Sequence, residues 1–356
     1  MKCGTMLRTG AGVLLALLAI AAQPSAWGQT LTTIDPQGAV FTSPVSINEA
    51  GQIVGLFADG NGLHGFVRDN DGTTTPFDGP GPFGTFPTYI NAQGSVVGTY
   101  YDENFNVQIF VRAKGSTTST PVTKLEVPSP AAYIYLVTGN SAGAIVGGFS
   151  DSNGKPGGFI RAPSGKFTFF EFPPAFLTTG FSPNILAMTP GATIVGSYLD
   201  SNFTMHGYLR TADGTITPFD PPNSVGTMPT SINDTGIVAG FFNDGSQNGN
   251  LRVFLRASDG TYSSFDTPTL GSNGAAASLN ASGAVAGNVI NNICNGGIFC
   301  TQVDFSFLRT ANGTVKTVND PLGVQGTQLG GINASGEMIG VYYDANGMQH
   351  GFAAKP

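Results

Sequence analysis

One short unit recurs seven times along this chain and constrains the fold more than any other feature. Its most regular position is the Gly that ends an Ile-Val-Gly-like element, with spacings of 43, 49, 49, 44, 47 and 53 residues between successive copies. This position holds Gly55, Gly98, Gly147, Gly196, Gly240, Gly287 and Gly340. A period of this length indicates a solenoid, a propeller or another repeat architecture. Because the copies fill residues 29–356, we expect a single domain over that range.

Each copy predicts four short β-strands. Pro229–Asn233, Thr193–Tyr198, His206–Arg210 and Thr215–Asp220 illustrate the four; β-branched and aromatic residues dominate, and turn residues bound each run. The second strand is apolar on both faces, as in Ile53–Phe57, which is typical of a strand held between two sheets. Four-stranded units that are buried on both faces indicate an all-β fold, a seven-bladed β-propeller with four antiparallel strands per blade.

The last copy lacks its fourth strand, because the chain ends at Gly351–Pro356, directly after the third. The stretch Leu31–Pro36, near the N-terminus, resembles the fourth-strand segment Thr215–Pro221. We therefore expect the N-terminal strand to complete the last blade. This pairing would close the ring and remove the two exposed strand edges of an open array.

The repeated pattern Ile-Asn-x-x-Gly-x-x-Val-Gly, followed by His-Gly-Phe, resembles the HAF-repeat family of bacterial extracellular proteins. The resemblance covers Val45–Ala354, although the HAF position carries Gly-Phe or Gly-Tyr in place of Ala-Phe. It implies an extracellular, propeller-like repeat protein. It supplies no catalytic residues, because the family has none established.

Residues 1–28 predict a secretory signal peptide. Lys2 and Arg8 precede the apolar run Val13–Ala22, and Ala26–Gly28 forms a small-x-small cleavage site before Gln29. A transmembrane anchor is the alternative, but the run is too short to cross ~30 Å of hydrocarbon. We therefore expect a secreted protein, periplasmic or extracellular, with no membrane insertion.

Net charge narrows the class of partner. The chain has 15 Lys and Arg against 22 Asp and Glu, and removal of residues 1–28 takes away two positive charges and leaves a net charge of −9. Such a chain lacks the basic surface with which proteins bind nucleic acids or anionic lipids. We expect a monomer whose partner is a protein or a surface glycan.

Cys294 and Cys300 lie close together in an insertion of the sixth copy, Asn288–Asp304. In an oxidising compartment this spacing favours a local disulfide. A metal site would need more ligands, and no His or third Cys lies nearby in the sequence. The insertion is either a contact element at the rim or a stabilised loop.

Two other patterns suggest metal sites, and simpler interpretations are favoured for both. His64, His206 and His350 occupy one repeat position in copies one, four and seven, which predicts packing between blades and not convergence on zinc. The Asp-x-Asn-Gly stretches, such as Asp151–Gly154, lack the carboxylate spacing of a calcium loop and predict hairpin turns. No metal and no cofactor are therefore predicted.

Two further repeated residues receive structural interpretations. An Asn followed three residues later by Gly predicts a type I turn, and copy four departs from this pattern with Met188–Gly191. The turn positions are Asn48, Asn91, Asn140, Asn233, Asn280 and Asn333. The repeated Arg, such as Arg68, is too far along the hairpin to pair with the acid of its own copy, such as Asp78, and its partner stays open.

The loops that join fourth strands to the next first strands are long and apolar, as in Gly79–Pro87 and Pro173–Phe181. We expect them on one face of the disc, around the channel mouth. Their side chains would form an apolar patch suited to a partner, unless the rings tuck between blades. The candidate binding residues are Phe83, Phe86, Tyr133, Phe176, Phe181 and Met228.

These features favour a secreted, non-catalytic binding or scaffold propeller that contacts a protein or a glycan through these loops. The first strands predict a channel lined by Ser, Thr, Tyr and aliphatic residues, without an obvious acid, base or metal ligand. No residue is assigned a catalytic role. Two alternatives stay open: a hydrolase or lyase acting at the channel mouth, and a passive structural protein of the cell envelope.

Overall fold

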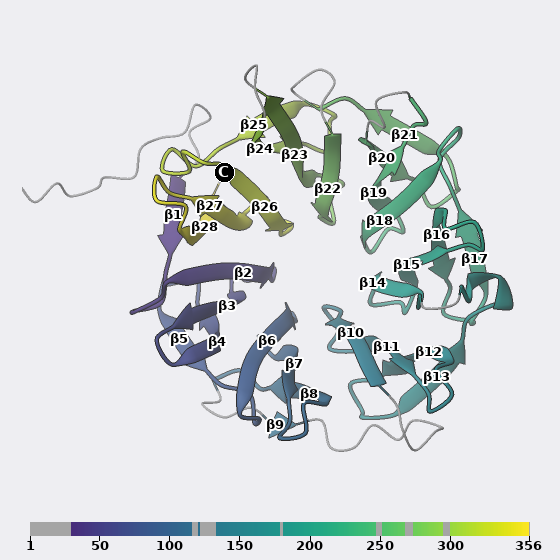
Figure 1. The fold of residues 1–356 in the computed structure, drawn as a ribbon, viewed down its shortest axis with the longest axis horizontal. Helices are drawn as coiled ribbons and strands as arrows, with labels where there is room; N and C mark the ends of the chain where they lie inside the picture. The colour runs from purple at the N-terminus through teal and green to yellow at the C-terminus, as the bar shows by residue number, and fades with distance from the viewer. Residues whose placement is uncertain are drawn as a thin grey trace, which may run out of the picture.

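The computed structural model of the protein describes residues 30–115, 120–121, 133–178, 181–246, 251–267, 273–294 and 300–355. Within this part of the chain, 28 strands form seven four-stranded antiparallel sheets, arranged as blades around a common axis (Figure 1). The predicted seven-bladed β-propeller is therefore confirmed.

The strands follow the repeat. Blade one has β2 (Phe41–Ile47), β3 (Ile53–Asp59), β4 (Gly62–Arg68) and β5 (Thr74–Phe77); blade two has β6 (Phe83–Ile90), β7 (Val96–Tyr101), β8 (Val107–Arg112) and β9 (Thr120–Pro121); blade three has β10 (Tyr133–Gly139), β11 (Ile145–Ser150), β12 (Pro156–Arg161) and β13 (Phe167–Glu171). Blade four has β14 (Asn184–Met188), β15 (Ile194–Leu199), β16 (Met205–Arg210) and β17 (Ile216–Phe219), preceded by the 3₁₀ turn η1 (Pro174–Phe176). Blade five has β18 (Gly226–Ile232), β19 (Val238–Asn243), β20 (Leu251–Arg256) and β21 (Tyr262–Phe265); blade six has β22 (Asn273–Leu279), β23 (Val285–Cys294), β24 (Cys300–Arg309) and β25 (Val315–Val318); blade seven has β26 (Thr327–Ile332), β27 (Met338–Tyr343), β28 (Gln349–Lys355) and β1 (Thr30–Ile34).

The second strand of each blade lies between two apolar layers, as its composition predicts. Ile53 and Val54, neighbours on β3, are both fully buried. Ile53 packs with Ile339 of blade seven, whereas Val54 packs with Phe110 of blade two. Because successive side chains of a strand point to opposite faces, one strand contributes to both inter-blade cores.

The repeated glycines allow aromatic rings to pack against the backbone. A Cβ added at Gly55 would lie 2.6 Å from the ring of Phe66, and one added at Gly65 would lie 2.5 Å from the ring of Phe77. Any side chain at either position would displace a buried Phe. This packing explains why Val-Gly and His-Gly-Phe recur together in the repeat.

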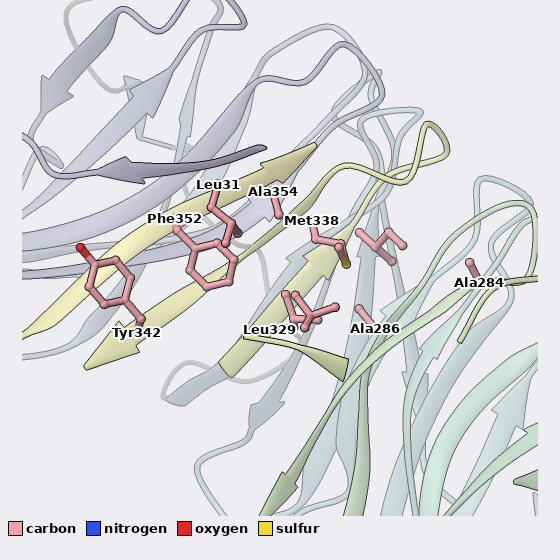
Figure 2. Packing of buried hydrophobic residues seen from close by; sticks show 10 residues of the cluster. Leu31, Ala284, Ala286, Leu329, Met338, Tyr342, Phe352 and Ala354 are labelled. Carbon is pink, nitrogen blue, oxygen red and sulfur yellow. The ribbon is translucent and has the colours of Figure 1, made fainter. Parts of the chain in front are cut away.

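The ring closes through the N-terminal strand, as predicted. In Figure 1, β1 lies at the outer edge of blade seven, and its register places Leu31 opposite Ala354 and Ile34 opposite Gly351 of β28. Leu31 belongs to the buried cluster shown in Figure 2, beside Phe352. The first and last strands of the chain therefore share one core.

The Asn turns are confirmed, and five of the turn Asn side chains also link neighbouring blades. Asn48 Oδ1 accepts hydrogen bonds from the backbone N–H groups of Ala50 and Gln52, while its amide donates to the carbonyl oxygen of Asn91 in the next blade, at 2.9 Å. Equivalent amide-to-carbonyl links join Asn140 to Thr189, Asn233 to Asn280, Asn280 to Asn333, and Asn333 to Asn48. The last of these links connects blade seven to blade one.

Blade four keeps the turn, but its register differs by one residue from the sequence interpretation. Thr189 takes the place of the repeated Asn, and its hydroxyl accepts the N–H of Thr193. Ala192, not Gly191, takes the place of the repeated Gly, with a φ of 63°. The interpretation of Met188–Gly191 as the turn was therefore wrong by one position.

In blades two, four, five and six the partner of the repeated Arg is an aromatic ring of the preceding blade, whereas Arg161 of blade three lies 6.0 Å from Phe167 of its own blade. The guanidinium carbon of Arg210 lies 4.4 Å from the ring centre of Phe170, and that of Arg256 lies 5.3 Å from Phe219. Arg112 and Arg309 make the same contact with Phe77 and Phe265. Arg68 lies opposite Thr74, which confirms that it is offset from Asp78.

Two predictions concern residues beyond this description. The signal peptide, residues 1–28, lies outside the described residues, and among the described ones no helix is long and apolar enough to cross a bilayer. The backbone register of β23 and β24 places Cys294 opposite Cys300, but their side chains lie outside the description. The disulfide therefore stays a prediction.

Candidate functional site

The two faces of the disc carry different connections. On the face we call the loop face, each first strand begins, the second and third strands are joined, and the fourth strand ends. On the opposite face, the turn face, lie the Asn turns and the turns between third and fourth strands. Any residue can thus be assigned to a face from its position in the repeat.

The loop face is the apolar face. All of the strongly exposed large hydrophobic residues among the described ones lie on it, at the starts of first strands or in the loops between second and third strands. Blades two, three and four contribute the aromatic ones: Phe83, Tyr101, Phe105, Tyr133, Phe181 and Phe203. Blades one, five and seven contribute Val40, Val225, Leu322, Val324 and Met348.

Three of the six predicted binding residues are exposed on this face. Phe83, Tyr133 and Phe181 are 41%, 61% and 50% exposed, respectively. Phe86 and Met228 are half-buried.

Phe176 is a correction, because it is buried and does not belong to the exposed patch. The 3₁₀ turn η1 directs its ring into blade four, where the ring stacks on Tyr198 with centres 3.6 Å apart. For this residue the alternative, a ring tucked into the core, is the correct one.

The sequence interpretation missed two exposed rings that pair with predicted ones. Phe105 stacks on Phe83 with ring centres 4.5 Å apart and planes 12° apart, and Phe203 packs edge-on against Phe181 at 5.9 Å. Both Phe105 and Phe203 occupy the fourth position of an Asp-x-Asn loop, where blades three and seven have Gly154 and Gly347. In the sequence, a Phe at a loop position that other copies fill with Gly could have identified these two residues.

These two phenylalanines have left-handed backbone conformations, with φ of 60° at Phe105 and 62° at Phe203. Residues other than Gly lose roughly 1–2 kcal/mol in this conformation. The rings are 67% and 63% exposed, so they add little to the core. Strained, exposed aromatic residues of this kind concentrate at functional sites.

The repeated His also lies on the loop face, where it joins strands of its own blade. His64 Nδ1 lies 2.6 Å from Asp78, its Nε2 lies 3.2 Å from Asp59, and its ring lies over Phe57 with centres 5.2 Å apart. His206 and His350 make the same contacts in blades four and seven. The prediction that these His pack between blades did not include these contacts, which arise because the acid ending the fourth strand lies beside the third strand.

These contacts shift the titration of His64. Partial burial disfavours its charged form, but the hydrogen bonds and charges of Asp78 and Asp59 outweigh that effect, so the pKa of His64 is raised. The pKa of Asp59 is lowered by the backbone N–H of Asn61, with a contribution from His64. The charged pair is therefore the favoured state at mildly acidic pH.

Positive charge is concentrated on the turn face, whereas acids lie on both faces. Among the described Lys and Arg residues, only Lys155 and Arg252 lie on the loop face, and the others end third strands or lie in nearby turns on the turn face. The loop face carries Asp35, Asp59, Asp78, Asp102, Glu103, Asp151, Glu171, Asp200, Asp220, Asp244, Asp266, Asp320 and Asp344. This face is therefore both apolar in part and strongly acidic.

The channel holds a pocket of about 330 Å³ lined mainly by first-strand residues. Every first strand has a β-bulge, and bulged residues such as Val45, Thr88 and Thr230 line the pocket. Glu49 and Asp234, which follow Asn residues of the turns, add carboxylates at the turn-face end that the sequence interpretation missed. Burial raises the pKa of Tyr89 to about 12, with further contributions from Asp234 and Glu49.

Comparison with known proteins identifies the fold and nothing finer. No protein-family model and no curated protein matches the sequence. Among solved structures, virginiamycin B lyase from Staphylococcus aureus is similar, with 16% identity, a TM-score of 0.60, and coverage of 92% of this chain and 100% of that one. The β-propeller domain of the Trilobed protease from Pyrococcus furiosus, which has an open velcro topology, is similar with 10% identity, a TM-score of 0.62, and coverage of 89% and 94%.

Acylaminoacyl peptidase from Pyrococcus horikoshii is also similar, with 12% identity, a TM-score of 0.58, and coverage of 86% of this chain and 50% of that one. At such low identities the likeness shows a shared β-propeller fold alone. The chain is therefore a β-propeller, and its own surface is the evidence for its function.

Proposed function

We propose that this protein is a secreted, non-catalytic binding propeller that contacts a protein or a surface glycan through its loop face. One observation carries the proposal: the strongly exposed large hydrophobic residues of the described chain all lie on that face. Exposed apolar patches on soluble proteins mark interaction surfaces.

The aromatic rings on blades two to four support a binding role more than a passive one. Phe105 and Phe203 hold left-handed positions that Gly fills elsewhere in the repeat, so the backbone alone does not require a ring there. Protein interfaces are enriched in aromatic residues, and such rings also offer flat apolar platforms to sugars. A purely structural envelope protein would not require these strained rings.

The test removes the two strained rings and keeps the fold. The double variant Phe105→Gly, Phe203→Gly places at both sites the residue that Gly154 and Gly347 provide in other blades. Binding would be measured on an array of bacterial cell-wall and plant glycans, and on immobilised cell-envelope proteins. We expect binding to weaken about tenfold or more, a change of about 1.4 kcal/mol, without a lower thermal midpoint.

Lys114→Ser, an exposed change on the turn face, is the matched control and should bind like the unmodified protein. Equal binding by the double variant would contradict the proposal. So would a loss of binding confined to turn-face variants.

The alternative of a hydrolase or lyase at the channel is favoured by one observation, the carboxylates of Glu49 and Asp234 at the pocket's turn-face end. One of the proteins with a similar fold is a lyase, but at 16% sequence identity the similarity supports a shared fold and not a shared activity. Turnover of small esters or lactones that disappears in Glu49→Gln would support this alternative over a binding role.

We also propose export and an internal disulfide. The opposed backbone positions of Cys294 and Cys300 support the pairing, because directly opposed antiparallel residues have Cα separations within the range of disulfides. The kinship with HAF-repeat proteins rests on the shared motif. Intact mass of the exported protein tests export and disulfide together: the expected chain starts at Gln29 and gains mass on reduction, and an uncleaved or unreactive chain would contradict them.

A further inference from the structure

The position that His64 occupies in blade one has an equivalent in every blade. The strand registers align His64 with His206, His350, Arg252 and Gly157, because each lies opposite the same second-strand position. That opposed residue is Phe57 in blade one and Phe149 in blade three. The residue at this position and the side chains around it can therefore be compared from blade to blade.

In blades one, four and seven an imidazole fills the position in one geometry. Its Nδ1 lies 2.6–2.7 Å from the acid that ends the fourth strand, and its Nε2 lies 3.2–3.7 Å from the acid that ends the second. The ring lies over an aromatic ring of the second strand, with centres 4.9–5.2 Å apart. In blade five Arg252 takes the position, 3.4 Å from Asp266.

Blade three keeps the surroundings and lacks the occupant. Phe149, Asp151 and Glu171 correspond to Phe57, Asp59 and Asp78, and Glu171 lies directly opposite Gly157. A pocket of about 310 Å³ lies here, lined by Phe149, Asp151, Lys155, Pro156, Gly157, Phe169, Phe170 and Glu171. The cavity thus has an aromatic floor and two carboxylates.

The acids of this pocket are available to a ligand. Asp151 Oδ1 accepts the backbone N–H groups of Asn153 and Lys155, both at 2.9 Å. The corresponding Asp200 uses Oδ1 in the same way and turns Oδ2 toward His206. Oδ2 of Asp151 therefore has the position from which a blade-four acid holds a ring nitrogen.

Glu171 has a partner that a ligand can displace. Lys155 Nζ lies 2.8 Å from Glu171 Oε2, but the two side chains are 47% and 77% exposed. Ion pairs this exposed contribute little to stability and exchange readily with solvent. Lys155 can swing outward on its long side chain, which leaves the carboxylate free for another cation.

We propose that the blade-three pocket binds a planar nitrogen cation, of which the arginine guanidinium of a partner protein is the main example. The ring of Phe149 or Phe169 would face the cation, and Asp151 and Glu171 would accept its N–H groups. The site lies on the acidic loop face, which attracts cations. The inference goes beyond the proposed function and does not depend on the aromatic residues of blades two and four.

The test uses small probes and the protein from Gln29 onward. n-Propylguanidinium is titrated while the backbone amide NMR signals of Gly157 and Gly158 are followed, with the neutral n-propylurea as the matched probe. We expect saturable shifts with guanidinium in the millimolar range and no saturable shift with urea. Equal shifts with both probes, or no shift with guanidinium, would overturn the proposal.

Three variants identify the site. Glu171→Gln removes an exposed charge and should weaken binding about tenfold, whereas Lys155→Met removes the competitor and should strengthen it. Gly157→His supplies the occupant of blade one and should abolish binding, although Phe149, 2.5 Å from the added Cβ, has to move. An unchanged dissociation constant in Glu171→Gln would overturn the assignment. The double variant Phe105→Gly, Phe203→Gly should bind the probe normally, so this site and the proposed function can fail separately.

Discussion

At the scale of single residues, the copies that depart from the repeat show what each repeat position requires. The fourth residue of each Asn turn has a left-handed backbone, and Gly51, Gly94, Gly143, Gly236, Gly283 and Gly336 fill it in six blades. In blade four Ala192 fills it with a φ of 63°. The alanine methyl group therefore sits in a conformation that its own sterics disfavour.

Ala192→Gly should stabilise the protein by roughly 0.5–1 kcal/mol, because relief of left-handed strain exceeds the entropy that an added Gly costs. Urea unfolding followed by fluorescence measures the change in midpoint. Gly236→Ala, the reverse change at the same position of blade five, should destabilise. A lower midpoint for Ala192→Gly would show that the methyl group has a packing role.

Residue patterns predicted backbone roles better than side-chain roles. The type I turns were predictable, because Asn and Gly at a spacing of three residues have few other structural uses. The burial of Phe176 was not, because an apolar residue in a loop can face the core or the solvent, and η1 decides which. Phe105 and Phe203 were missed for a related reason: their backbone conformation is visible only beside the glycines of other blades.

At the scale of elements, a His at the start of a third strand ties three strands of one blade together. His64 joins Asp59, which ends β3, to Asp78, which follows β5. Gln108 takes this position in blade two and donates to Asp102 at 3.1 Å without any titration. The third-strand side chain therefore contacts the acid after the second strand as a titratable His in blade one and as a neutral Gln in blade two.

The stabilisation from His64 should depend on pH. Its pKa is raised in the folded state, so the contribution is full below the ordinary value of 6.5 and is lost as pH rises through the folded pKa. His64→Gln should therefore lower the thermal midpoint more at about pH 5.5 than at about pH 8.5. Gln108→Ala should cause equal losses at both pH values, and equal losses for His64→Gln would refute the charged pair.

The strands and their order within each blade were predictable from composition and period, but contacts between blades were not. Arg210 meets Phe170, and Asn280 meets Asn333, across a blade boundary. The position of a residue within one repeat does not tell which neighbouring blade its side chain faces. The contacts of His206 with Asp200 and Asp220 of its own blade were not predicted either.

At the scale of the whole molecule, stability depends on the closing strand. Ile34 on β1 is buried in the core between blades seven and one, next to Ile53 and Ile339. Ile34→Ala should lower the free energy of unfolding by about 2–5 kcal/mol, as expected for a buried large-to-small change. Denaturant unfolding measures it. Thr32→Ala, at an exposed site of the same strand, should have little effect, and comparable losses in both would contradict this view of closure.

Net charge was predictable from the sequence, and the concentration of positive charge on the turn face could have been. The third strands of blades one to six end with Arg and that of blade seven ends with Lys355, all on the turn face, while acids end or follow second and fourth strands on the loop face. Once the strands are assigned, alternation of direction puts these basic residues and these acids on opposite faces. The carboxylates of Glu49 and Asp234 at the channel are different, because turn geometry and not strand direction places them.

The pairing of β1 with β28 also has a consequence for the order in which the chain is made and folds. The ribosome makes β1 first and β28 last, and contacts such as that between Asp35 and His350 join residues 315 positions apart. Until β28 has been made, β1 and β27 each have an unpaired edge, a state that favours misassociation. A chain cut short anywhere before β28 can never hide that edge. Pairing of β1 with β28 therefore covers both edges in a single step, and a chain in which the two strands have not met exposes both of them to other chains.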